Sequence, residues 1–135
     1  MRRVVKIIVC ILLFFVGAFW GLLTIYRFAV EGEIAGSYIF YDGTRTIANL
    51  HKHQTVIPPS VVDYKTDGKF ITVKQYADSI YILDYKLIDY PDDALSGFYY
   101  WIIDVKEDII VGGPLKYEQF RKECDLRGLS RELIF

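Results

Sequence analysis

The sequence has few of the residues that catalytic and metal sites use most. Its 135 residues include two cysteines and two histidines, and two cysteines are too few for a disulfide-stapled scaffold. The 16 Lys+Arg against 17 Asp+Glu lack the basic surplus of a nucleic-acid-binding protein, so we expect no nucleic acid partner. Hydrophobic residues are abundant at 53%, and aromatic residues make up 16% of the chain. This excludes intrinsic disorder, and the length excludes two full catalytic domains.

An uninterrupted apolar run lies near the N-terminus. The uncharged residues from Ile7 to Tyr26 would form a helix about 30 Å long, which matches the hydrocarbon core of a bilayer. Three basic residues precede the run, namely Arg2, Arg3 and Lys6. The positive-inside rule then places the N-terminus in the cytoplasm. We expect residues 1–29 to be a signal anchor that crosses the cytoplasmic membrane once, and residues 30–135 to be an exported domain.

A cleaved signal peptide is the main alternative, because Val16-Gly17-Ala18 fits a small-residue cleavage pattern. Cleavage there would leave the apolar segment FWGLLTIY on the new N-terminus, in contact with water. The uncleaved anchor is therefore the favoured interpretation. Lipid attachment at Cys10 is disfavoured, since Val9 stands where a small residue is expected.

The chain after the apolar run is acidic and rich in tyrosine. Residues 28–135 hold 12 Lys+Arg and 17 Asp+Glu, a net charge of −5. Short β-branched and aromatic stretches separated by turn residues predict strands over 37–41, 44–50, 61–64, 70–75, 79–85, 98–105 and 109–111. Pro58-Pro59 favours a loop over 51–60, and Gly112-Gly113-Pro114 is expected to end the sheet.

One soluble helix is predicted, over residues 116–127, where Tyr117, Phe120 and Cys124 recur at helical spacing. The most apolar strand, 98–105, is expected to be central. The predicted fold class is α+β, with one N-terminal transmembrane helix, a small antiparallel β-meander and a C-terminal helix packed on it.

The residues that carry chemistry form no recognisable catalytic set. His51 and His53 would share one face of a strand and are the weak candidates for metal ligands, but no third ligand lies near them in the sequence. Cys124 falls on the predicted buried stripe, where a thiol is inert. We therefore expect no enzyme activity and no cofactor.

Aromatic residues supply the candidate recognition surface. In the stretch Phe98–Trp101 successive side chains alternate between faces, so one set is expected in the core and the other at the surface. Exposed tyrosine and tryptophan suit protein interfaces, because they bring large area at small entropic cost. The candidate partner-binding residues are Tyr99 and Trp101, with Tyr81 and Tyr85 of the strand 79–85.

The stretch from Tyr99 to Phe120, YYWIIDVKEDIIVGGPLKYEQF, resembles a pattern in small bacterial envelope proteins of unknown function. These are usually lipoproteins or membrane-anchored, and they share an aromatic-W/Y-I-I-D strand, a turn and a G-P-L-x-x-x-x-F entry into a final helix. This chain differs in its extra glycine at Gly112-Gly113 and in lacking a lipobox. The resemblance implies a fold and a cellular address, and some proteins of this size and address are immunity proteins against toxins.

The leading hypothesis is a membrane-anchored, non-catalytic binding protein of the bacterial envelope, with a protein partner outside the cytoplasmic membrane. An immunity-type inhibitor is its most specific form. One alternative is a metal-binding or hydrolytic envelope enzyme that uses the His51/His53 region. Another is a structural subunit of a membrane complex, in which the apolar helix itself is the interaction element.

Overall fold

The structure is a computed structural model that describes residues 1–77, 88–92 and 96–135, with only the backbone described for residues 2, 3 and 24–31. The chain divides into two units, Met1–Glu31 and Gly32–Phe135. The strand predicted over 79–85 lies outside the described residues.

The first unit is the helix α1, Arg2–Val30. Its segment Val4–Leu23 spans 20 residues with a mean hydropathy of 2.5. By length and composition this helix is apolar enough to cross a membrane, and a signal sequence has the same features.

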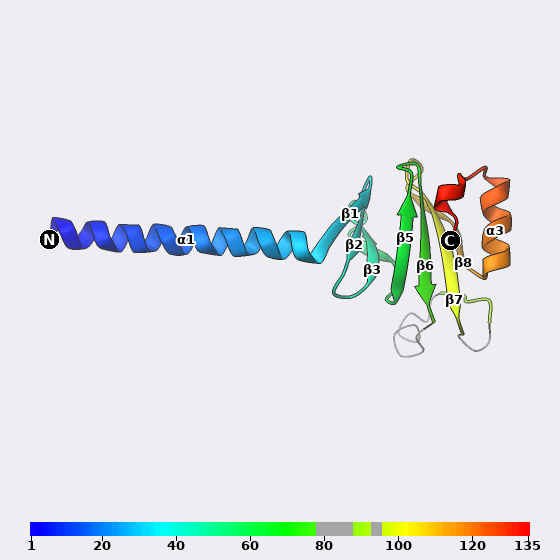
Figure 1. Cartoon of the computed structure of the whole chain (residues 1–135), viewed down its shortest axis with the longest axis horizontal. Coiled ribbons are helices and arrows are strands. Elements are labelled where there is room, and N and C mark those ends of the chain that lie inside the picture. The colour runs from blue at the N-terminus through cyan, green and yellow to red at the C-terminus, as the bar shows by residue number, and fades with distance from the viewer. Residues whose placement is uncertain (78–87, 93–95) are drawn as a thin grey trace. The chain divides into compact units, whose positions relative to one another are not determined.

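The second unit contains two antiparallel four-stranded sheets rather than a single meander. Sheet A consists of β1 Glu31–Ala35, β2 Tyr38–Tyr41, β3 Thr46–Asn49 and β4 Gln54–Ile57. Sheet B consists of β5 Val61–Thr66, β6 Phe70–Tyr76, β7 Phe98–Asp104 and β8 Ile109–Leu115. Strands follow chain order in each sheet (Figure 1), and the segment Pro58–Ser60 carries the chain from one to the other. The α+β class is confirmed, and it includes the helix α3, Tyr117–Leu126, and the short 3-10 helix η1, Arg131–Leu133.

Two local predictions are wrong. Residues 54–57 form β4 instead of a loop. Only Ile57 of this strand is buried and its polar half faces solvent at the edge of sheet A, so the sequence shows no apolar strand pattern there. Gly112-Gly113-Pro114 does not end sheet B but lies within β8. Because β8 is an edge strand, the missing N–H of Pro114 is tolerated, and the register with β7 shifts beside these glycines.

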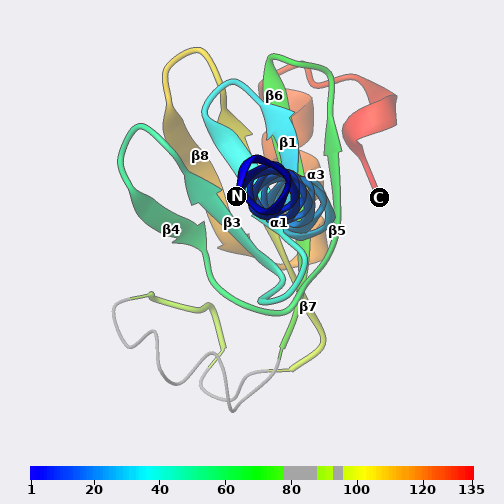
Figure 2. The ribbon, with the colours of Figure 1, turned by 90° about the vertical axis from the view of Figure 1, so that its left-hand side faces the viewer.

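The domain has three layers, in the order sheet A, sheet B and α3 (Figures 1 and 2). One core cluster lies between the sheets and includes Ile47, Ile57 and Trp101. The other lies between sheet B and α3 and includes Tyr100 and Phe120. β7 contributes to both clusters, which confirms the prediction that it is a central strand.

Candidate functional site

The candidate recognition residues Tyr99 and Trp101 are buried, with exposed fractions of 0% and 3%. The Trp101 indole packs between the sheets and donates a hydrogen bond to Gln75 Oε1 at 3.0 Å. The Tyr99 hydroxyl donates to a carboxylate oxygen of Asp92 at 2.9 Å. The predicted exposure of both residues is wrong, because sheet A covers Trp101 and the ring of Tyr90 packs 4.8 Å from that of Tyr99. Tyr81 and Tyr85 lie outside the described residues.

Exposed rings lie instead on the α3 side of sheet B. Tyr76 and Phe98 are directly opposite each other on β6 and β7, are 49% and 40% exposed, and have ring centroids 5.4 Å apart. Tyr117, at the start of α3, is 40% exposed, and its ring lies 5.4 Å from that of Tyr100. Tyr100 follows Phe98 by two residues on the same face of β7. We call the three exposed rings of Tyr76, Phe98 and Tyr117 the aromatic face.

The aromatic face is a surface and contains no catalytic arrangement among the described residues. Lys74 lies on β6, opposite Tyr100 of β7, and holds its ammonium 4.4 Å from the centre of the Phe98 ring. A cation over an aromatic ring is attracted to the negative π face. Such a surface can bind a partner through apolar area and charge.

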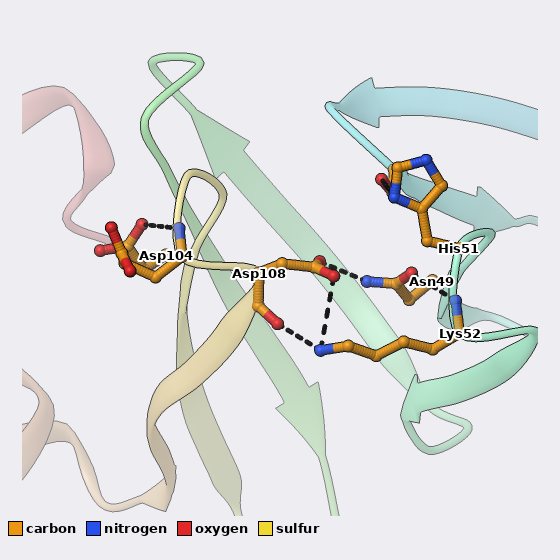
Figure 3. Close-up of polar contacts among 7 residues, drawn as sticks. Asn49, His51, Lys52, Asp104 and Asp108 are labelled. Carbon is orange, nitrogen blue, oxygen red and sulfur yellow. Dashed lines mark hydrogen bonds and ion pairs between the residues drawn. The ribbon is translucent and has the colours of Figure 1, made fainter.

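The histidine turn between β3 and β4 lies close to the acidic turn between β7 and β8 (Figure 3). His51 and Lys52 lie in the β3–β4 turn of sheet A, and Asp108 lies in the β7–β8 turn of sheet B. The Asp108 carboxylate accepts a hydrogen bond from Asn49 Nδ2 at 2.5 Å and forms an ion pair with Lys52 at 3.5 Å. Lys52 also donates to the backbone carbonyl of Asp108.

These contacts form an inter-sheet clamp, which we define as Tyr38, Asn49, Lys52 and Asp108. A hydrogen bond from the Tyr38 hydroxyl, with smaller contributions from Asn49 and Lys52, holds the pKa of Asp108 below its usual value. Burial, and next the hydrogen bond to Asp108, raise the pKa of Tyr38 to about 12. The clamp therefore contains a carboxylate that stays ionised and a phenol that stays neutral, which suits a structural tie and not proton transfer.

The histidines do not join the clamp. The His51 Nδ1 shares a 3.0 Å hydrogen bond with Ser37 Oγ, and both His51 and His53 are exposed. Among the described residues, no group of three or more His, Cys, Asp or Glu side chains is placed to hold a metal ion. Lys52 thus ties the turn that carries both histidines to the β7–β8 turn, and no described residues complete a metal site there.

Cys124 lies in the core between α3 and sheet B and is fully buried. Burial raises the pKa of its thiol to about 11, so the thiolate is scarce at neutral pH. The prediction that Cys124 is a core residue is confirmed. Tyr117, predicted on the same buried stripe, is instead partly exposed.

Sequence reasoning missed the aromatic face, although one signal was present. Phe98 and Tyr100 share a face by alternation, as do Tyr99 and Trp101, and nothing in the pattern says which face a second sheet covers. Tyr76 directly follows a predicted strand, 70–75, and its pairing with Phe98 depends on the register between β6 and β7.

Together these features define a small α+β domain that follows an apolar N-terminal helix and exposes a row of aromatic rings on one side. The chain belongs to the family described as "Protein of unknown function (DUF3997)", whose model matches residues 38–135. The matched region begins at β2 and includes the aromatic face and the inter-sheet clamp. No curated protein and no solved structure matches the chain.

Proposed function

We propose that this protein is a non-catalytic binding protein of the bacterial envelope, held to the cytoplasmic membrane by α1 and contacting a protein partner through the aromatic face. The observation that carries the proposal is the row of exposed rings on a domain that follows a 20-residue apolar segment. Partly exposed aromatic side chains that contact one another are typical anchors of protein interfaces. An immunity-type inhibitor, whose partner is a toxin, is the most specific form of this function.

The charge pattern around α1 supports an exported domain. Arg2, Arg3 and Lys6 lie at the N-terminal end of the apolar segment, while Arg27 is followed closely by Glu31 and Glu33. Under the positive-inside rule this asymmetry keeps the N-terminus in the cytoplasm and the domain outside.

The anchor is tested with the full chain in cells that produce it. We expect the protein to stay in the membrane pellet after an alkaline carbonate wash, at the mass of the uncleaved chain. We also expect external protease to digest the domain once the outer barrier is opened, while the cytoplasm stays sealed. Recovery in the soluble fraction, or a shortened N-terminus, would show that α1 is not a retained anchor.

The binding surface is tested by photo-crosslinking in the same cells. A photoreactive phenylalanine analogue placed at position 98 or 76 is expected to capture a partner. The same analogue at position 126 is the control, because Leu126 is 81% exposed and lies at the end of α3, away from the exposed rings. Equal capture at positions 98 and 126, or capture at neither, would contradict the proposed surface.

A helix exchange separates this proposal from a structural subunit that interacts through its membrane helix. Replacing the apolar residues of Val4–Leu23 by a leucine-rich span of equal length keeps the anchor and removes its specific sequence. We expect crosslinking at position 98 to survive this exchange. Its loss would assign the interaction to α1.

A further inference from the structure

The aromatic face is bordered by cations that form no close ion pair with a carboxylate among the described residues. Lys74 holds its ammonium over Phe98, and Lys65 holds its ammonium 4.9 Å from the ring centre of Phe135 while donating to the Ile134 carbonyl at 2.7 Å. Arg121, one helical turn after Tyr117, is hydrogen-bonded to the Tyr117 hydroxyl and is attracted more weakly by Asp125, one turn further along α3. The ion pairs found within 4.0 Å in the described part of the chain involve none of these three residues.

This arrangement is unusual for the domain that carries it. The chain after Arg27 has a net charge of −5, so unpaired cations on one face are not a consequence of a basic composition. Asp63 lies opposite Lys74 on β5 but forms no ion pair with it, and its carboxylate accepts a hydrogen bond from the Tyr64 backbone N–H. The two lysines are held by rings and a carbonyl, and Arg121 by a hydroxyl, so that the three positive charges are available to an incoming anion.

We infer that the aromatic face binds an acidic segment of a protein partner, with carboxylates meeting Lys65, Lys74 and Arg121 and an apolar side chain meeting the exposed rings. This inference rests on the proposed function and names the chemistry of its partner. A lysine already held against a ring loses less side-chain entropy on pairing, and opposite charges across an interface speed encounter and fix the register.

The alternative anionic surface, a bilayer of acidic lipid, fits less well. A bilayer extends past the aromatic face and would also meet the rest of a net acidic domain, which it repels. A protein segment contacts only the face itself. The acidic remainder of the domain would therefore weaken binding to a bilayer but not binding to a protein segment.

The test uses full-length protein in an uncharged detergent and a labelled peptide that alternates Glu with Tyr and Phe. A peptide with Lys in place of each Glu is the matched probe. We expect binding of the acidic peptide, little binding of the basic one, and roughly tenfold weaker binding of the acidic peptide to Lys74→Glu and to Arg121→Glu. Lys106→Glu, in the exposed β7–β8 turn, changes net charge equally and is expected to bind like the parent. Circular dichroism shows whether each variant is folded, and Lys74→Gln gives a milder change at the same position.

Equal affinity for the two peptides, or equal effects of Lys74→Glu and Lys106→Glu, would overturn the inference. Capture of the protein by phosphatidylglycerol vesicles without binding of the acidic peptide would assign the face to the bilayer and also overturn it. A partner crosslinked at position 98 through a segment that is not acidic would leave the proposed function standing while this inference fails.

Discussion

Two aromatic residues on the same strand, Trp101 and Phe98, have opposite surroundings. Trp101 is enclosed between the sheets and its indole N–H is satisfied by Gln75, whereas Phe98 is partly in solvent beside Tyr76. Gln75 is itself fully buried and donates to the carbonyl of Pro59 at 2.9 Å, so removal of the indole would leave a buried amide oxygen with one partner fewer. Stability and binding are therefore expected to depend on different aromatic residues.

At this scale we predict that Trp101→Ala lowers the free energy of unfolding by about 4 kcal/mol, because it opens a cavity in the core. Phe98→Ala is expected to lower it by about 1 kcal/mol or less, since the ring is partly exposed. Urea denaturation of both variants measures the difference. Similar losses for the two variants would contradict the assignment of Trp101 to the core and Phe98 to the surface.

Phenol ionisation gives a second prediction at the residue scale. The pKa of Tyr38 is raised to about 12, mainly by burial, and that of Tyr90 to about 12 for the same first reason. Because these pKa values are higher in the folded state, the neutral phenols stabilise the fold fully below the unfolded pKa of about 10. This stabilisation is lost as the pH rises toward 12. We expect the free energy of unfolding to fall across that interval.

The control is Tyr38→Phe, which cannot ionise. It is expected to be less stable than the parent at neutral pH, because it lacks the hydrogen bond to Asp108, and to lose less stability between pH 10 and 12. Parallel pH profiles for parent and variant would show that Tyr38 does not titrate in the folded domain as described.

At the scale of elements, the sequence predicted strands well where the pattern was apolar and failed where packing decides. The structure contains the strands predicted over 37–41, 44–50, 61–64, 70–75 and 98–105, and the helix predicted over 116–127. β4 was missed, because only Ile57 in Gln54–Ile57 is buried. The strand predicted over 109–111 was too short, because β8 continues through Gly-Gly-Pro to Leu115. Such a strand is tolerated only at the edge of a sheet, and the order of strands cannot be read from one sequence.

Gly113 in β8 lies against the Trp101 ring, which leads to a prediction for this strand. It has φ of +131°, and a Cβ built there would lie 2.6 Å from the Trp101 ring. Gly113→Ala is expected to lower the free energy of unfolding by about 3 kcal/mol, from backbone strain together with overpacking. Gly68→Ala is the matched control, because Gly68 also has a positive φ but nothing lies within 4 Å of its Cβ position.

Thermal or urea denaturation compares the two glycine variants. A smaller loss for Gly68→Ala than for Gly113→Ala would isolate the steric effect of Trp101. Equal losses would mean that backbone strain alone accounts for both, and that β8 does not press against the indole.

At the scale of the whole molecule, the candidate site shows why the sequence led us to expect the wrong rings of β7 at the surface. The alternation in β7 was predicted, but the sequence contains no direct record that a second sheet lies on the Trp101 side and a short helix on the other. The meeting of the histidine turn with the acidic turn was likewise unreadable, since Asn49 and Asp108 are 59 residues apart. Contacts at such separation are set by the packing of sheets and not by local pattern.

The core between the two sheets also bears on the order in which the protein folds during synthesis. Sheet A leaves the ribosome before any part of sheet B, and its inward residues Ile47 and Ile57 find cover only when β6 and β7 arrive. A nascent chain that pauses before residue 98 would expose these apolar residues to solvent. Synonymous codons that slow translation in this interval should therefore raise the yield of aggregated or degraded protein without altering a single amino acid.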